Sequence, residues 1–309
     1  MITDKKILSV TREGNVMDEK DWHLLVTLYH ERNITKAAER LYISQPALTY
    51  RLQQLEKEFG AKIVTRGKKG VEFTVQGAYL VEYSKEMLLQ LRKAKEYILN
   101  MEQNVKGTLR LGVSGMFARY ELPKLLKNFL AKYPDVEINL KTGWSSEINQ
   151  LLQKEEVHLG IVRGNYDWHG EAYLFREEML SIAYNKKIEL EELPTLPQIH
   201  YRTDPSLRTQ IDNWWKEIFR TPPTVAMEVD RIDTCKQLVL NGLGYAIFPN
   251  ICLSDDEPLY TFPLISSNQQ PLLRKTWIIY RESSLELTFV KAFIDFMKEE
   301  AAHRSKMNG

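Results

Sequence analysis

The stretch from Asn33 to Gly60, NITKAAERLYISQPALTYRLQQLEKEFG, constrains the fold of this chain more than any other. Its apolar residues recur every three or four positions in two runs separated by a short break, which indicates two amphipathic helices joined by a tight turn. Ser44 is suited to cap the second helix, and Pro46 falls in its first turn, where a missing N–H costs little. This layout is typical of a DNA-reading helix-turn-helix, although a helical hairpin in an unrelated core has the same period.

The face of the second helix that remains after its core positions are removed favours DNA recognition. It carries amide and hydroxyl groups that can pair with base edges, and a planar guanidinium that suits phosphate or guanine. The residues on this face are Gln45, Thr49, Tyr50, Gln53 and, at its edge, Arg51. We therefore expect this helix to contact DNA.

The longer run AAERLYISQPALTYRLQQLEKEFGAKIVTR resembles the N-terminal domain of LysR-type transcriptional regulators. That family has a similar alanine pair, Ser-Gln-Pro-Ala-Leu turn and Leu-Glu-x-x-x-Gly ending. The resemblance implies that Gln45, Pro46 and Thr49 lie where the family contacts bases in the major groove. Tyr50 departs from the pattern, because many members have arginine there, so the operator sequence does not carry over.

A two-stranded wing is predicted over residues 61–75, because two apolar segments flank the glycine-containing turn RGKKG. The whole chain has a net charge of only +1, but four cations lie within the eight residues from Lys62 to Lys69. A basic tip beside a recognition helix suits phosphate contact or insertion into the minor groove, whereas a solvated hairpin is the alternative. The complete set of expected DNA-binding residues is Ser44, Gln45, Pro46, Thr49, Tyr50, Arg51, Gln53, Arg66, Lys68 and Lys69.

Length and composition are those of an ordinary globular protein. The chain has 309 residues, of which 43% are hydrophobic, enough for two or three domains. No apolar run approaches the ~20 residues of a membrane span, and residues 1–16 lack the apolar segment of a signal peptide. We therefore expect a cytoplasmic protein with no membrane partner. Residues 1–16 are interpreted as an extension, because the family usually begins at the position of Met17.

Nothing in the sequence indicates an enzyme or a metal site. The only cysteines, Cys235 and Cys252, are too far apart for a CxxC motif, so we expect buried structural thiols, with a disulfide switch as the alternative. The six histidines are scattered without metal-ligand spacing, and no phosphate loop or nucleophile elbow occurs. We expect no catalytic activity, no metal and no cofactor.

Residues 76–105 indicate one long helix without glycine or proline after Gly77. Its apolar residues follow the four-three alternation of a coiled-coil seam, with Ser84 in the one vacant step. The seam residues are Leu80, Met87, Leu91, Ala94, Ile98, Met101 and Val105. Such a stripe needs a partner, and the resemblance implies that the linker helices of two subunits pair in a homo-oligomer, either a dimer or a tetramer.

From Thr108 onward, short strands alternate with helices in two successive groups, which predicts two α/β units with parallel strands. Two such lobes resemble the periplasmic-binding-protein-like effector domain of LysR-type regulators. The expected architecture is α/β overall, with a winged helix-turn-helix over 17–76, a linker helix over 77–106 and a two-lobed effector domain over 107–309. A solute-binding protein with an appended helical domain is the alternative, but such a protein has no use for the first hundred residues.

Ligands of open parallel sheets bind beyond the carboxyl ends of the strands, near helix N-termini that favour anions. Hydroxyl-bearing helix entries follow several of the predicted strands. Arg163 ends one strand, and a cation facing a cleft needs an anionic partner or water. The expected effector-binding residues are Ser114, Gly115, Ser145, Ser146, Arg163, Thr203, Thr234 and Arg274.

Three segments in this half, TGWSSEINQLL, VHLGIVRGNYDWHG and VDRIDTCKQLVLNGLGYAIFP, resemble the catabolite-control branch of the family, whose members respond to citrate. The resemblance implies a citrate-like anion around Ser114, Ser145, Ser146, Arg163 and Arg274. Residues 176–196 are dissimilar, so sulfur metabolites and other dicarboxylates remain open as effectors.

Overall fold

The computed structural model describes residues 17–67, 70–102, 104–164, 167–254 and 256–307. The chain divides into two compact units, residues 1–98 and 99–309. Within the described residues, no helix is both long and apolar enough to cross a lipid bilayer.

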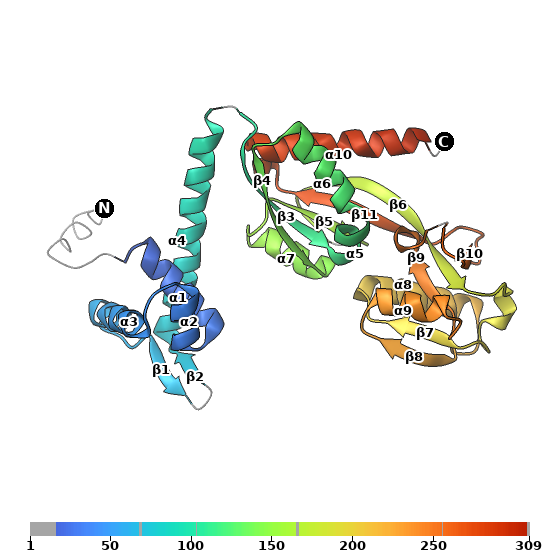
Figure 1. The fold of residues 1–309 in the computed structure, drawn as a ribbon, viewed down its shortest axis with the longest axis horizontal. Helices are drawn as coiled ribbons and strands as arrows, with labels where there is room; N and C mark the ends of the chain where they lie inside the picture. Colours follow the sequence, from blue (N-terminus) through green and yellow to red (C-terminus); the bar gives the residue numbers. More distant parts are fainter. Residues whose placement is uncertain (1–16, 68–69, 103, 165–166, 255, 308–309) are drawn as a thin grey trace, which may run out of the picture. The chain divides into compact units, whose positions relative to one another are not determined.

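Within its described residues, the first unit consists of three short helices, a two-stranded wing and one long helix (Figure 1). Its elements are α1 Glu19–Glu31, α2 Ile34–Arg40, α3 Gln45–Phe59, β1 Val64–Gly67, β2 Gly70–Phe73 and α4 Val75–Asn100. The predicted helix-turn-helix and wing are therefore confirmed. Ala37 and Ala38 are buried between the helices, as are Leu48, Leu52 and Leu55 of α3.

Local hydrogen bonds define where the helices of this unit begin. The Asp18 carboxylate accepts from the backbone N–H groups of Lys20 and Asp21, at 2.9 and 3.1 Å, and caps α1. The Ser44 hydroxyl accepts from the N–H of Ala47 at 3.3 Å and caps α3. These side chains satisfy amide donors that have no partner within the helix.

A buried ion pair joins α1 to α3. Asp21 is 2% exposed, and its Oδ1 accepts from Nε of Arg51 at 2.6 Å. Burial alone would raise the pKa of Asp21, but hydrogen bonds from Arg51 and from the backbone of Asp18 outweigh it and hold the pKa below its usual 3.8. The pair therefore stabilises the crossing of the two helices.

Contacts of Arg32 join the wing to the end of α1. The N–H of Val71 donates to the carbonyl of Arg32 at 2.9 Å. The Arg32 guanidinium lies over the ring of Tyr29, 4.0 Å from its centre. Gly70 has φ +119°, and a Cβ there would lie 2.5 Å from the Arg32 carbonyl oxygen, so this turn requires glycine.

The long helix α4 ends at Asn100, earlier than the Val105 that we expected. The Asn100 side chain donates to the carbonyl of Glu286 at 2.6 Å and accepts from the N–H of Thr288 at 2.7 Å, so it caps the start of α10. Leu80 and Ser84 of the predicted seam are buried within the first unit, whereas Ile98 is exposed.

The second unit contains a seven-stranded mixed sheet in the order β10-β6-β11-β5-β3-β4, with β9 also paired to β6, and a separate parallel pair, β7–β8. Its first-lobe elements are β3 Gly107–Ser114, α5 Gly115–Tyr120, α6 Leu122–Lys132, β4 Val136–Gly143, α7 Ser145–Gln153 and β5 Leu159–Arg163. The chain continues through β6 Glu171–Tyr184, β7 Gln198–Tyr201, α8 Pro205–Ile218, β8 Val225–Val229, α9 Ile232–Leu240, β9 Ala246–Pro249, β10 Tyr260–Pro263, β11 Leu273–Tyr280 and α10 Thr288–Met307.

Two long strands depart from the expected parallel arrangement. Strands β3, β4 and β5 pair in parallel, as predicted, but β11 returns antiparallel to both β5 and β6. The first half of β6 pairs with β11, and its second half pairs with β9 and β10, so β6 belongs to both lobes. The first half of this strand carries several charged residues, so no apolar run marks its full length in the sequence.

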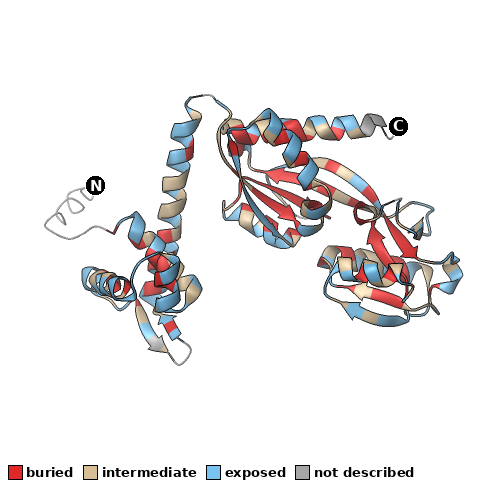
Figure 2. Cartoon of the chain, in the orientation of Figure 1, coloured by how far each residue is buried: buried red, intermediate tan, exposed pale blue. Residues whose placement is uncertain are grey.

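The central strands β3 and β5 of the first-lobe sheet are largely buried, whereas the edge strand β4 is mostly exposed (Figure 2). On β5, Leu159 and Ile161 belong to the core that includes α6 and α10, whereas Val162 packs with Ile148 and Leu152 of α7. Helices therefore cover opposite faces of the sheet (Figure 1), and the ends of its strands are left for polar side chains.

Replacing Arg51 by glutamine leaves the buried Asp21 carboxylate without its cation, so we expect α1 and α3 to lose about 2 kcal/mol of protection against local unfolding. Amide hydrogen exchange of the full chain measures this loss. Arg40→Gln is the matched control, because it breaks a more exposed ion pair with Glu31 and should change protection by less than about 1 kcal/mol. Equal effects of the two substitutions would contradict this role of Arg51.

The same pair also implies a pH dependence. Because the pKa of Asp21 is lower in the folded state, the stabilisation is fully present above the ordinary carboxyl value of 3.8 and is lost as the pH falls through the lowered value. The difference in protection between wild type and Arg51→Gln should therefore shrink in acid.

Candidate functional sites

The outer face of α3 presents most of the side chains that the sequence assigned to DNA. Gln45, Pro46, Tyr50 and Gln53 are all exposed, with Tyr50 at 64%. Thr49 is half-buried, and its hydroxyl donates to the carbonyl of Gln45 at 3.0 Å, which leaves its lone pairs free to accept. This face therefore offers amide, hydroxyl and phenol groups to a partner.

Two expected contacts have structural roles instead. Ser44 caps α3, so its hydroxyl already accepts a hydrogen bond. Arg51 is committed to Asp21, an acid that lies thirty positions away in the sequence and that sequence analysis did not connect to it. We therefore remove Arg51 from the set of proposed DNA contacts.

The turn before α3 contains an exposed aromatic residue that sequence analysis did not assign to DNA. Tyr42 is 96% exposed and has a left-handed backbone, with φ 57°. The neighbouring Ile43 is 41% exposed. The sequence alone could have singled out Tyr42, because a helix-turn-helix turn needs no large apolar side chain for its geometry.

Lys68, Lys69 and the side chain of Arg66 lie outside the described part of the wing.

In the second unit, a polar cluster forms where the two lobes meet. Arg274 of β11 donates from Nη2 to the carbonyl of Arg163 at 2.9 Å. Its Nη1 donates to the hydroxyl of Ser206 at 2.8 Å, and Nη2 lies 3.5 Å from Asp204, the cap of α8. Arg274 thereby connects the end of β5 in the first lobe to the start of α8 in the second.

The anionic partner that we expected for Arg163 comes from within the chain. Arg163 pairs with Glu178 of β6, and their side chains are 3% and 2% exposed. Strand β11 separates β5 from β6, so the two side chains meet across it, beside the buried Thr276. Burial, together with the nearby charge of Arg274, lowers the pKa of Arg163 to about 10, so it stays protonated at neutral pH.

This cluster also holds hydroxyls that are buried without a hydrogen-bond partner in the described structure. They are Oγ of Ser114 and Oγ1 of Thr276. Nη1 of Arg163 donates to the weak acceptor Sδ of Met116 at 2.9 Å. Buried hydroxyls normally have a partner, so these two groups remain available to a polar ligand.

The remaining expected effector residues fall into two groups. Ser145 is buried, and its hydroxyl accepts from the N–H of Arg163 at 3.0 Å, so it fixes the end of β5 to α7. Gly115, Ser146 and Thr234 are exposed, and Thr203 is half-buried. Sequence analysis missed Glu178, which lies in the dissimilar stretch, and also Asp204, Ser206 and Met116.

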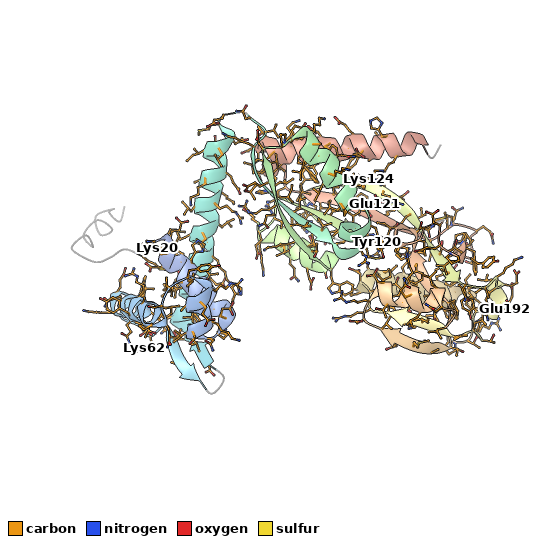
Figure 3. All side chains as sticks on the ribbon, in the orientation of Figure 1. Lys20, Lys62, Tyr120, Glu121, Lys124 and Glu192 are labelled. Carbon is orange, nitrogen blue, oxygen red and sulfur yellow. The ribbon has the colours of Figure 1, made fainter. Side chains whose placement is uncertain are left out.

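A second contact between the lobes lies beside Thr234. Asp233 of α9 accepts from the Tyr120 hydroxyl at 2.9 Å and lies 2.9 Å from Nη1 of Arg119. Tyr120, labelled in Figure 3, is the last residue of α5, and Ser114 directly precedes this helix. The start of α9 is therefore connected to the helix that carries the first-lobe side of the cluster.

The two cysteines are poor candidates for a thiol switch. Cys235 and Cys252 are free and buried. Burial raises the pKa of both thiols to about 12, so neither forms much thiolate at neutral pH. Among the residues that the structure describes, no three His, Cys, Asp or Glu side chains are grouped to hold a metal ion.

Comparison with protein families matches both halves of the chain. Residues 20–78 match the family described as "Bacterial regulatory helix-turn-helix protein, lysR family", and residues 102–302 match "LysR substrate binding domain". The HTH-type transcriptional regulator YraN of Bacillus subtilis (strain 168) is 47% identical over 284 residues, which cover 92% of this chain and 98% of the relative. The regulator YkuM of the same organism is 37% identical over 285 residues, which cover 92% of this chain and 97% of the relative.

The fold is also found in solved structures of other regulators. Full-length CbnR complexed with its target DNA has a TM-score of 0.67 at 20% identity, covering 92% of this chain and 99% of that one. A full-length OxyR variant from Pseudomonas aeruginosa has a TM-score of 0.61 at 19% identity, covering 91% and 98%. The regulatory helix-turn-helix, the effector-domain match and the closely similar relatives agree, and the chain belongs to the LysR family of DNA-binding transcriptional regulators.

Proposed function

We propose that citrate or a similar carboxylate, bound between the lobes of the effector domain, modulates operator binding by this LysR-family regulator. The observation that carries the proposal is the polar cluster at the lobe junction, where two arginines and partnerless buried hydroxyls converge. Guanidinium groups bind carboxylates with two parallel hydrogen bonds, so the cluster suits a polyanion better than a neutral ligand.

The internal pair indicates how such an anion would compete for the site. Glu178 pairs with Arg163, and it is itself a carboxylate. A citrate carboxylate that replaces it keeps the charge of Arg163 neutralised, and a second carboxylate can accept from Ser114. Because Arg274 already contacts both lobes, a ligand held there would favour one arrangement of the lobes over another.

The ligand can change DNA binding only if it binds two arrangements of the lobes with different affinities. Such coupling is typically about 1 to 3 kcal/mol, enough to change operator affinity about 5- to 150-fold. Other dicarboxylates and sulfur metabolites remain alternatives for the ligand, and they belong in the same binding screen. Oxidation of Cys235 or Cys252 is disfavoured by their burial.

For DNA, the proposed base-reading residues are Gln45, Pro46, Thr49, Tyr50 and Gln53, with Ser44 holding the helix start. Arg66, Lys68 and Lys69 of the wing are proposed as phosphate or minor-groove contacts on the strength of the sequence. A two-fold symmetric operator requires two DNA-binding domains. We therefore also propose a homo-oligomer paired through α4, whose Ile98 is 63% exposed.

One prediction of this proposal separates the reading of bases from general attraction to DNA. Gln45→Ala should weaken binding to the sequence recovered by in vitro selection by roughly 1 to 3 kcal/mol, because an amide pair with one base is lost. Binding to random DNA should stay nearly constant. Arg66→Ala should instead weaken both and flatten the salt dependence. Equal losses on both DNAs for Gln45→Ala would reject its role in base reading.

The second prediction concerns assembly. Leu91→Asp together with Ile98→Asp should place charges in an apolar seam and dissociate the oligomer. Light scattering measures the mass, and Lys93→Asp, an exposed position on the same helix, is the control. A folded double mutant with unchanged mass would show that the oligomer forms elsewhere.

The third prediction tests the ligand site with a minimal change. Ser114→Ala removes a buried hydroxyl that has no partner, so the free protein should be no less stable, whereas citrate affinity measured by calorimetry should fall about tenfold. Ser283→Ala, at an exposed position outside the expected effector-binding set, is the control and should change neither quantity.

Substitutions of Glu178 and Arg163 give a complementary test of the ligand site. Glu178→Gln removes the competing carboxylate and should strengthen citrate binding, whereas Arg163→Gln combined with Glu178→Gln should abolish it without leaving a buried charge. Citrate binding by the double mutant at wild-type affinity would reject the site. Failure of the wild type to bind citrate would reject this ligand, and the carboxylate and sulfur-compound screen would then be read out on the same variants.

A further inference from the structure

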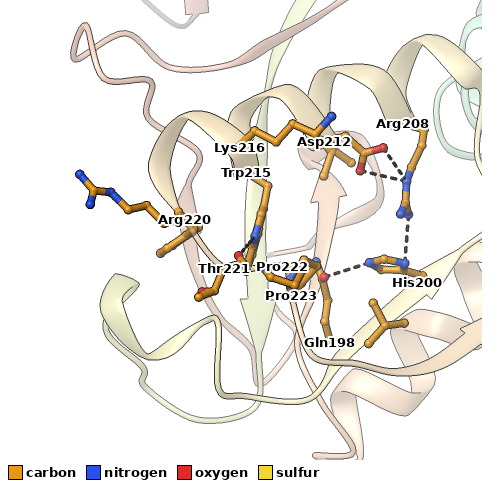
Figure 4. Close-up of a pocket in the computed structure, with 13 residues that line it drawn as sticks. Gln198, His200, Arg208, Asp212, Trp215, Lys216, Arg220, Thr221, Pro222 and Pro223 are labelled. Atoms are coloured by element: carbon orange, nitrogen blue, oxygen red, sulfur yellow. Dashed lines mark hydrogen bonds and ion pairs between the residues drawn. The ribbon is translucent and has the colours of Figure 1, made fainter.

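A concave site lies within the second lobe and shares no lining residue with the polar cluster. Its volume is about 420 Å³, and it is formed by α8, the strands β7 and β8, and the loop between α8 and β8 (Figure 4). One wall is apolar, with Trp215 and Phe219 in tilted contact at 4.5 Å between ring centres, and with Val225 of β8. A site of this size accommodates a small organic molecule.

The opposite wall carries a chain of hydrogen bonds (Figure 4). Asp212 accepts from Nε of Arg208 at 3.0 Å, Nη1 of Arg208 lies 3.1 Å from Nδ1 of His200, and Nε2 of His200 lies 2.9 Å from Oε1 of Gln198. A guanidinium can only donate, so Nδ1 of His200 must accept and its proton must sit on Nε2. Burial and the charge of Arg208 lower the pKa of His200, which keeps the imidazole neutral.

The charge of the lining is unbalanced. Arg208, Lys216 and Arg220 are cations, and Asp212 is the one carboxylate among the described lining residues. That carboxylate is already bound to Arg208. The site therefore combines an excess of positive charge with a flat aromatic wall.

We propose that this pocket is a second ligand site of the effector domain, selective for a small carboxylate with an aromatic body. The ring lies against Trp215 and Phe219, and the carboxylate lies toward Arg208. The proposal does not depend on citrate, because none of these residues belongs to the polar cluster at the lobe junction.

The position of the pocket on α8 connects it to that junction. Asp204 caps α8 and lies near Arg274, while Arg208 and Asp212 follow at successive turns of the same helix. Residues four apart share one helix face, so a ligand that fixes Arg208 acts on the helix whose first turn contacts the other lobe. Occupancy of the pocket is thus coupled to the arrangement of the cluster.

Calorimetry of the full-length protein with phenylacetate tests the proposal, with acetate and 2-phenylethanol as probes that lack the ring or the charge. We expect phenylacetate to bind and both partial probes to bind at least about tenfold more weakly. Arg208→Gln should weaken phenylacetate binding about tenfold, as expected for loss of one charged hydrogen bond. Val225→Phe, at an exposed position, should weaken it by filling the pocket without altering the hydrogen-bond chain.

Two control variants locate the binding. Lys187→Gln removes an exposed cation of the same lobe outside the pocket, and Ser114→Ala alters only the polar cluster, so both should bind phenylacetate as the wild type does. Wild-type affinity in both pocket variants, loss of binding in Ser114→Ala, acetate binding as tightly as phenylacetate, or no phenylacetate binding at millimolar concentration would each overturn the proposal.

Discussion

The effector domain depends on a buried charge pair, Arg163 with Glu178, whose side chains are almost fully excluded from water. Removing both charges from water is costly, and only their close contact offsets it; removing one partner typically costs about 3 to 5 kcal/mol. The pair exists because β11 lies between β5 and β6 and brings their side chains into reach. A ligand carboxylate that takes the place of Glu178 keeps Arg163 paired and leaves Glu178 to take up a proton or find another donor, whereas a neutral ligand would leave both charges unpaired.

The DNA-binding unit uses the same interaction in a different place. Asp21 and Arg51 connect α1 to α3, so the cation that the sequence assigned to DNA fixes the angle of the reading helix instead. In both units, an arginine that sequence analysis expected to bind DNA or effector because of its charge binds an acid from a distant segment of the chain. Sequence periodicity cannot show such a partner, because neither Asp21 nor Glu178 is close in sequence to the arginine it binds.

What the sequence did predict follows from local rules. Helical spacing and the Ser44 cap are set by neighbouring residues, and both are found as expected. Strand and helix alternation likewise predicted the first-lobe elements. The early end of α4 and the antiparallel return of β11 depend instead on contacts between distant segments, such as Asn100 with Thr288. The same holds for the pocket at Arg208, which exists only when α8 packs on β7.

The central claim is that an anion takes the place of Glu178 at Arg163. Crystal structures of the full-length protein with and without citrate test it most directly. The account predicts that citrate lies at the lobe junction, that one of its carboxylates contacts Arg163, and that the Arg163–Glu178 pair is broken. Citrate bound elsewhere, or bound at the junction while that pair remains intact, would contradict it.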